Sequence, residues 1–253
     1  MKGCGMNKRE QAIFSILKAS VALFHDNGYQ GTSVRQIAET AGVSLGMVNH
    51  YFGSKECLGS QVLSLLDTHA NAALPSKLSF PDDPILFDLV AVRLLYTFLS
   101  AHGYWDFYVD SLRFDFFFNN LTNRPSILID ELSKTYSFEA SADAILLYSR
   151  FLPYMMEKTV VIKKAEGLFP SISYEEVPYL VCQTAMSHFI PEADVKARDA
   201  DSKAIAARIG AGLTPAPSDD LIKDFACRFD ESMQHKTPET HWMNQVAQQL
   251  QTP

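Results

Sequence analysis

Cysteine is scarce in this chain of 253 residues. Cys4, Cys57, Cys182 and Cys227 stand far apart, with no Cys-x-x-Cys spacing and no histidine cluster beside them. Zinc sites need ligands at close spacing, and small secreted scaffolds need many paired cysteines. The sequence therefore predicts a cytoplasmic protein without a metal site. A redox-sensing thiol stays open as an alternative.

Long hydrophobic runs are also missing. The richest apolar stretch, residues 86–99, is broken by Asp88 and Arg93. A membrane-spanning helix needs about 20 mainly apolar residues, so we predict no membrane span. The N-terminus lacks the basic, apolar and cleavage regions of a signal peptide. The overall apolar content of 47% is ample for a buried core.

The common sequence fingerprints of catalysis do not occur. The chain has no Gly-x-Ser-x-Gly, His-Glu-x-x-His, P-loop or dinucleotide motif. His102 and Asp106 lie four residues apart, as do His188 and Glu192, but such pairs are common on helix surfaces. We therefore predict no enzyme activity and no cofactor. No alternating strand pattern occurs either, which favours an all-α fold.

The pattern that is present lies in residues 28–58 and is typical of a helix-turn-helix. Ser33, with a glutamine three residues later, predicts a capped helix start. Gly42 suits the left-handed position that ends a helix. Ser44 then caps a helix over residues 45–52, about 12 Å long. Two helices joined by a short glycine turn form the unit whose second helix enters the DNA major groove.

Helices are predicted on both sides of this motif. Residues 8–26 carry apolar side chains at helical spacing and should form a helix that covers the motif, ending at the Asn27-Gly28 pair. Ser54 is expected to cap a fourth helix that leads into the rest of the chain. The apolar positions of the first helix are Ile13, Ile16, Leu17, Val21 and Phe24.

Residues 8–66 resemble the DNA-binding domain of the TetR/AcrR family of transcriptional regulators. The resemblance covers about a quarter of the chain and is continuous over some thirty positions. It rests on Phe24, Gly28, Tyr29, Thr32, Ser33, Ile37, Ala38, Ala41, Gly42, Val43, Ser44, Gly46, Tyr51, Phe52, Ser54, Lys55, Glu56 and Leu58.

The resemblance implies roles for individual residues of the motif. Side chains expected to contact DNA phosphates, through a helix N-terminus, a hydroxyl or a cation, are Thr32, Ser33, Tyr51 and Lys55. Those expected to face base edges are Ser44, Leu45, Gly46, Met47, Asn49 and His50. Asparagine suits adenine, and an apolar side chain suits the thymine methyl group. Many relatives carry a basic residue at the position of Leu45, so DNA binding by this chain should depend less on charge at that position.

The charge is divided unevenly along the sequence. The whole chain carries −7. Residues 1–60 hold six basic and four acidic side chains, which gives +2, so the remainder carries −9. A slightly basic N-terminal region in an otherwise acidic chain is consistent with DNA contact through one face of the protein. Because cations are few, we expect that two copies are needed for DNA binding, and the resemblance implies that they bind a palindromic operator as a dimer.

The remaining sequence predicts a second, helical domain over residues 75–253 for effector binding and dimerisation. Its helices are expected at 84–101, 105–120, 126–136, 138–166 with a bend near Pro153, 174–189, 218–234 and 238–250. Residues 191–217 are expected to be partly loop and mobile. The apolar stripes of 174–189 and 218–234 are expected to pair with those of a second copy, as in the family.

Aromatic side chains are dense between Phe80 and Phe118. The resemblance implies that such helices enclose a pocket for a small-molecule effector, here an apolar or aromatic one; a bulky core is the alternative. The candidate pocket residues are Tyr96, His102, Trp105, Phe114, Phe117, Phe118, Tyr154, Cys182 and His188.

The function that the resemblance implies is a ligand-responsive repressor. Effector binding would move the fourth helix as a lever and change the separation of the two recognition helices. A helical adaptor of the same fold, controlled by a protein partner, stays open as the alternative.

Overall fold

The computed structural model describes residues 6–116 and 127–229 of the chain, and within them every regular element is a helix. This confirms the all-α prediction. The chain forms two compact units. The N-terminal unit contains described residues 6–69, 102–116 and 214–229, and the body unit contains 70–101 and 127–213. The predicted boundary between residues 66 and 75 stays a prediction.

The first helical element of the N-terminal unit is α1 (Lys8–Gly31). Asn7 caps it with a full capping box. Gly28 takes the non-helical values φ 69 and ψ 170, so the helix that starts at Lys8 is interrupted at the Asn27-Gly28 pair as predicted, and a short helical segment follows to Gly31. Glycine adopts positive φ without a Cβ penalty, so the chain can change direction at this kink.

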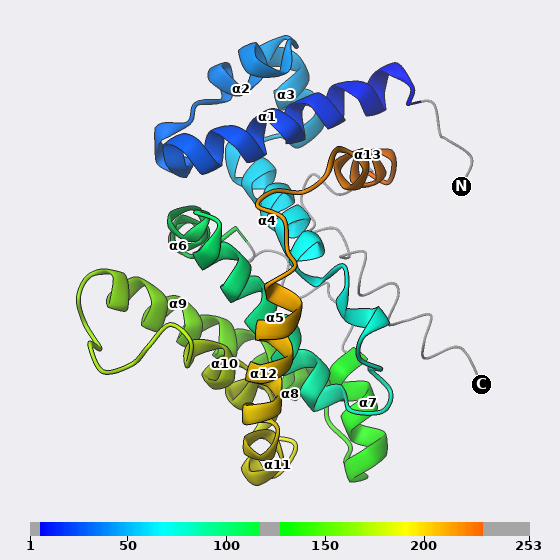
Figure 1. Cartoon of the computed structure of the whole chain (residues 1–253), viewed down its shortest axis with the longest axis vertical. Helices are drawn as coiled ribbons and strands as arrows, with labels where there is room; N and C mark the ends of the chain where they lie inside the picture. The colour runs from blue at the N-terminus through cyan, green and yellow to red at the C-terminus, as the bar shows by residue number, and fades with distance from the viewer. Residues whose placement is uncertain (1–5, 117–126, 230–253) are drawn as a thin grey trace. The chain divides into compact units, whose positions relative to one another are not determined.

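The two motif helices are α2 (Val34–Ala41) and α3 (Leu45–Phe52), and both begin as predicted. The side chain of Ser33 accepts a hydrogen bond from the backbone N–H of Gln36, and that of Ser44 accepts one from Met47. Gly42 takes φ 67 in the turn between them. Figure 1 shows α2 and α3 beside α1. The core of this region consists of Ile13, Ile16, Leu17, Phe24, Ile37, Val48 and Phe52, all at most 2% exposed.

A fourth helix, α4 (Lys55–Asn71), follows directly, and Ser54 caps it through the N–H of Cys57 as predicted. The N-terminal unit ends within this helix at His69, and the body unit begins at Ala70. The helix α4 is thus one continuous covalent connection between the two units.

Two further helices belong to the N-terminal unit although the sequence assigned them to the second domain. The ring of Phe107 in α6 (Trp105–Arg113) stacks on Phe24 of α1 at 5.0 Å between centroids. The helix α13 (Asp219–Cys227) packs on α1, where Lys18 pairs with Asp219 at 2.8 Å. The predicted helix 105–120 therefore ends early, at Arg113.

The apolar stripe of α13 was expected to join a second copy, and this prediction is wrong. Ile222 and Phe225 are 3% and 6% exposed. Just beyond α13, Phe229 lies 5.0 Å from Phe52 between ring centroids, and its carbonyl accepts a hydrogen bond from Arg9. The stripe is buried within its own unit and is not available for pairing. The predicted helix 238–250 lies outside the described residues.

The body unit is arranged around α5 (Pro84–Ala101), with α12 (Asp199–Gly210) and α10 (Val177–Met186) packed against it. Figure 1 shows α5 and α12 side by side. By length and mean hydropathy (1.6), α5 would also suit a membrane span, but its packing identifies it as a core helix. The remaining elements are η1 (Leu74–Ser76), α7 (Ile127–Tyr136), α8 (Ala142–Leu146), η3 (Leu147–Phe151), α9 (Leu152–Ala165) and α11 (Glu192–Ala197).

The distortion expected near Pro153 takes a defined form. The segment η3 is one turn of π-helix, and Pro153 lies in the first turn of α9 directly after it. Proline lacks the N–H that would donate to the preceding turn. The wider turn thus accommodates the proline without ending the helical run.

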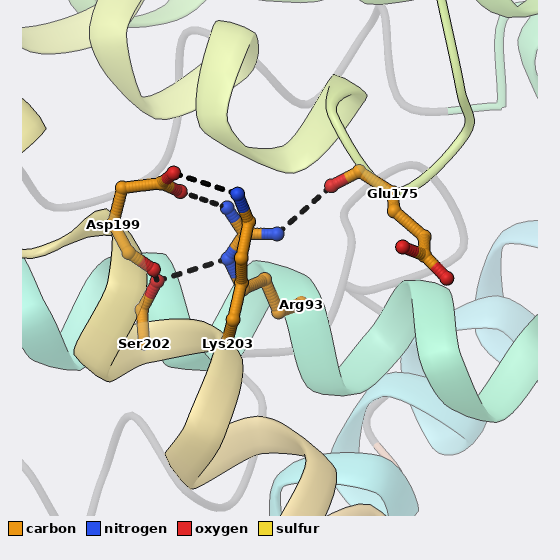
Figure 2. A network of polar contacts seen from close by, with 5 residues as sticks. All are labelled: Arg93, Glu175, Asp199, Ser202 and Lys203. Carbon is orange, nitrogen blue, oxygen red and sulfur yellow. Dashed lines mark hydrogen bonds and ion pairs between the residues drawn. The ribbon is translucent and has the colours of Figure 1, made fainter.

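A buried arginine holds α12 onto α5, and residues 191–217 are partly helical and partly loop as predicted. Arg93 is 5% exposed and donates from Nε to Ser202 Oγ at 2.9 Å. It also donates to the backbone carbonyl of Glu175 at 2.8 Å and pairs with the carboxylate of Asp199. Figure 2 shows these contacts, together with Lys203, which donates to the same carboxylate of Asp199 at 2.7 Å.

Candidate DNA-binding surface

The helix α3 turns one side to the core and the other to solvent. Val48 and Phe52 are buried, whereas Ser44, Leu45, Gly46, Asn49 and His50 are exposed and Met47 is half-buried. Leu45 keeps 41% of its surface exposed. The side chains predicted to face bases therefore share the outward side of one helix. Contact with bases stays a prediction.

Of the two residues predicted to meet phosphate before α2, only Ser33 has an exposed side chain. Thr32 is 1% exposed, and its hydroxyl lies 2.8 Å from the carbonyl oxygen of Gly28 and 3.0 Å from that of Leu23. It closes the last turns of α1 from inside the unit. The hydroxyl of Thr32 is therefore engaged within the unit, and phosphate contact at the helix N-terminus that begins at Thr32 and Ser33 stays a prediction.

Lys55, at the start of α4, is held against an aromatic ring. Its Nζ atom lies 4.0 Å from the ring centroid of Tyr29, a distance that suits a cation–π contact. Burial lowers the pKa of Lys55, although the nearby carboxylates of Glu56 and Asp110 act in the opposite direction. The ammonium group is thus fixed in place before any DNA arrives. The phenol of Tyr51 is half-buried, 5.0 Å from the ring of His50.

Asp110 of α6 is a buried acid that sequence reasoning missed. It is 7% exposed, accepts a hydrogen bond from Gln30 Nε2 at 3.1 Å, and lies 3.4 Å from Arg113. It is close enough to influence the pKa of Lys55. The aromatic residues around it made this helix resemble a pocket wall. No local signal in the sequence indicates that it contacts α1.

The candidate effector residues do not form one set. Three of them, His102, Trp105 and Phe114, lie in the N-terminal unit. The carbonyl of His102 accepts from His25 Nε2 at 3.1 Å if that nitrogen carries the proton, and Phe114 packs 5.3 Å from Tyr29. These three therefore belong to the surroundings of α1. Phe117 and Phe118 lie outside the described residues.

The other four candidates lie in the body unit. The hydroxyl of Tyr96 donates to Glu157 Oε1 at 2.5 Å, and Tyr154 is buried at 6% exposure. Burial raises the pKa of the Cys182 thiol well above its ordinary value. His188 is exposed and stacks on Tyr148 at 3.5 Å between ring centroids. No group of three or more His, Cys, Asp or Glu side chains within residues 6–116 and 127–229 is placed to hold a metal.

Comparison with known families decides the class of this helix-turn-helix. Residues 16–60 match the profile described as "Bacterial regulatory proteins, tetR family". The helix-turn-helix region of this chain is therefore of the TetR-family type. The match covers most of α1, both motif helices and the first turns of α4. It therefore contains the exposed side of α3 and Lys55.

Several TetR-family relatives share the N-terminal region with this chain. It is 36% identical over 63 residues to the HTH-type transcriptional regulator BetI of Pectobacterium carotovorum, which covers 25% of this chain and 32% of that protein. It is 35% identical over 98 residues to the HTH-type transcriptional repressor NicS of Pseudomonas putida, which covers 38% and 41%. These matches span less than half of each relative's length. The similarity therefore lies mainly in the N-terminal region and includes little of the body unit.

Solved structures of TetR-family proteins align along most of the chain at low similarity. A regulator from Streptomyces coelicolor covers 88% of this chain and 100% of its own at 19% identity, with a TM-score of 0.36. A regulator from a Shewanella species covers 79% and 96% at 17% identity, also with a TM-score of 0.36. The likeness to the TetR family therefore rests on the N-terminal match.

Proposed function

We propose that this TetR-family protein is a ligand-responsive transcriptional repressor that binds a palindromic operator as a dimer. The observation that carries the proposal is the exposed side of α3, which presents Ser44, Leu45, Asn49 and His50 away from a packed core. Proteins of this family are generally DNA-binding and non-enzymatic. The proposal therefore concerns binding, and no catalytic group is assigned.

The geometry suits one DNA half-site for each copy. The helix α3 would lie in the major groove, where an asparagine pairs with adenine and a leucine contacts a thymine methyl group. Lys55 and the N-terminus of α2 near Ser33 would contact the phosphates on either side. Few cations are available in this unit, so the second copy supplies the phosphate contacts that one copy lacks.

The body unit offers an apolar surface for the second copy. Leu147, Leu152 and Met155 are 46%, 42% and 46% exposed, and they lie on successive turns of η3 and α9. The helix α10, which packs on α9, keeps Leu180 and Val181 half-buried. Exposed apolar residues that cluster in this way commonly mark an interface. We propose that α9 and α10 form the dimer contact. The earlier prediction that the helix within residues 174–189 contacts the second copy is thus kept for α10, whereas α13 takes no part in the proposed contact.

Introducing charge at this surface tests the dimer. The double variant Leu147→Lys, Met155→Lys is expected to shift the protein from dimer to monomer, because two ammonium groups from each copy would have to be buried in the interface. Light scattering after size exclusion gives the mass directly. Leu45→Lys, which changes an equally exposed leucine on α3, is the control and should remain dimeric. A double variant that stays dimeric at micromolar concentration would place the interface elsewhere.

Ligand binding could change operator binding through two helices, α4 and α6. The helix α4 runs from Lys55 into the body unit, and α6 places Asp110 near Lys55. A ligand that favours one position of α4 over another would change the spacing of the two α3 helices, which must match half-sites about 34–36 Å apart. The change in operator affinity can be only as large as the ligand's preference between the two states.

Removing the cation at residue 55 tests the phosphate contact. Lys55→Ala is expected to lower operator affinity about tenfold, to the same degree on cognate and scrambled duplexes, since a phosphate contact carries no sequence information. Two such contacts are lost in a dimer, so the slope of log affinity against log salt should fall by about 2. Fluorescence anisotropy at several salt concentrations measures both. Lys77→Ala removes an exposed cation of the body unit and should change neither the operator affinity nor its dependence on salt.

The proposal as a whole is tested by footprinting the purified protein on its own upstream promoter region at two salt concentrations. A protected palindrome over unprotected flanks is the expected result. If that region stays unprotected, selection from random duplexes follows. Failure to enrich any palindrome would contradict the proposal.

A further inference from the structure

The C-terminal part of the described chain returns to the helix-turn-helix unit. Residues 214–229, which we call the C-terminal strap, belong to the N-terminal unit, whereas the preceding helix α12 belongs to the body unit. The strap begins beside the point where α4 leaves its unit, because the carbonyl oxygen of Thr214 lies 2.9 Å from Nε2 of His69. A carbonyl only accepts a hydrogen bond, so the imidazole donates from that nitrogen. The start of the strap is thus attached to α4.

The middle of the strap is α13, which packs along α1. Figure 1 shows the two helices beside each other. The ion pair between Lys18 and Asp219 is 52% exposed on both sides, so it contributes little to this packing. The side chains of Ile222, Phe225 and Ala226 are buried. Apolar packing therefore holds α13 in place.

The last residue of the strap, Phe229, contacts the second helix of the motif. Its ring lies 5.0 Å from the ring of Phe52, the last residue of α3. The two residues are 4% and 1% exposed. The backbone of Phe229 is also fixed, because its carbonyl accepts a hydrogen bond from Nη2 of Arg9 at 3.1 Å. The strap thus joins α4, α1 and α3 at three successive points.

The helix α3 is too short to fix its own position. It has eight residues, and isolated helices shorter than about 12–15 residues are marginal in water. Its position therefore depends on the side chains that it buries, which are Val48 and Phe52. The strap packs against the second of these two side chains. The placement of α3 thus depends in part on residues near the opposite end of the chain.

We infer that the C-terminal strap positions α3 for reading DNA, with Phe229 as the positioning residue. Because Phe229 is buried, it acts through Phe52 and not through a DNA contact of its own. Loss of its ring leaves the C-terminal end of α3 without a packing partner, and hydrogen bonds to base edges tolerate only small displacements. Phosphate attraction falls off more slowly with distance. The inference rests on the proposed function for its DNA readout, but not for the position of α3.

Truncation of Phe229 in the full-length protein tests the DNA readout. Phe229→Ala is expected to weaken binding of the cognate duplex about tenfold, which is comparable to one mismatched base pair. Binding of a scrambled duplex should stay within about twofold, because phosphates supply that affinity. Fluorescence anisotropy, well below the melting temperature of the variant, measures both. Phe229→Leu keeps an apolar side chain of similar size and should retain most of the discrimination.

The matched control is Phe225→Ala, the same truncation one turn earlier in the part of the strap that packs on α1. Phe225 is 6% exposed, so its loss should also lower the melting temperature. The ratio of cognate to scrambled affinity should nevertheless remain that of wild type. Equal loss of this ratio in Phe225→Ala and Phe229→Ala would mean that the strap only stabilises the unit, and would overturn the inference.

Amide hydrogen exchange measures the anchoring of α3 without DNA, so the two proposals can fail independently. Phe229→Ala is expected to speed exchange in α3 about tenfold relative to both wild type and Phe225→Ala. Unchanged exchange in α3 would contradict the inference whatever the DNA result. If α3 is loosened but the wild-type protein selects no palindrome, the anchoring stands and the repressor fails. If wild type and Phe229→Ala discriminate a palindrome equally well, the repressor stands and the strap has no part in DNA reading.

Discussion

Asn49→Ala is expected to remove sequence discrimination at one base pair in each half-site of the operator. Asn49 is exposed on the outward side of α3, and its amide offers a donor and an acceptor that together match the major-groove edge of adenine. A bidentate contact of this kind is worth about 1–3 kcal/mol. Because a symmetric dimer loses it twice, affinity for the cognate duplex should fall by about 2–6 kcal/mol.

The measurement is a comparison of cognate and scrambled duplexes by anisotropy at one salt concentration. The cognate duplex should lose most of its advantage, while binding to the scrambled duplex stays nearly constant because phosphates supply that affinity. Asn27→Ala removes an exposed amide from α1 and is the matched control. An equal loss on both duplexes would contradict base reading by Asn49 and would indicate a damaged recognition helix.

The helix-turn-helix was predictable because its determinants are local. Ser33 and Ser44 cap their helices through N–H groups only three residues away, and Gly42 adopts its left-handed turn within the same stretch. Each of these features depends on side-chain chemistry within one helical turn. A reader of the sequence needs no knowledge of the rest of the fold to find them. The ends of α2 and α3 were predicted correctly for the same reason.

The sequence did not reveal that α6 and α13 belong to the N-terminal unit, because their contacts are with residues distant in the sequence. Phe107 stacks on Phe24, and Phe229 packs on Phe52. The periodicity of α6 and α13 shows that each has an apolar side, but not what covers it. Thr32 illustrates the same limit, since its place at a helix start suggested phosphate contact whereas its hydroxyl closes α1.

Asp88 and Arg93 show how one sequence feature can have two structural meanings. In the sequence both interrupt an apolar stretch and argue against a membrane span. In the structure Arg93 is fully engaged with α12 and the Glu175 carbonyl, whereas Asp88 contacts a thiol and lacks a cation among the described residues. The difference between them depends on neighbours that the sequence does not reveal.

Arg93→Ala is expected to lower the free energy of unfolding of the body unit by about 3 kcal/mol. The guanidinium is buried and connects α5 to α12 and to the segment before α10. Its removal leaves the Ser202 hydroxyl, the Glu175 carbonyl and the Asp199 carboxylate without their shared donor. Breaking a buried charge pair typically costs about 3–5 kcal/mol. The lower value applies here because Asp199 keeps 25% exposure and a second partner in Lys203.

The matched control is that second partner. Lys203→Ala removes the other cation from the same carboxylate, but its side chain is 51% exposed, so the loss should be about 0.5 kcal/mol or less. Urea unfolding followed by circular dichroism measures both variants against wild type. The contrast compares a buried and an exposed cation at the same carboxylate, and Arg93 additionally donates to Ser202 and to the carbonyl of Glu175. Equal losses in the two variants would mean that α12 is held by its apolar contacts, including those of Ala206 with the α5 cluster, and that the arginine adds little.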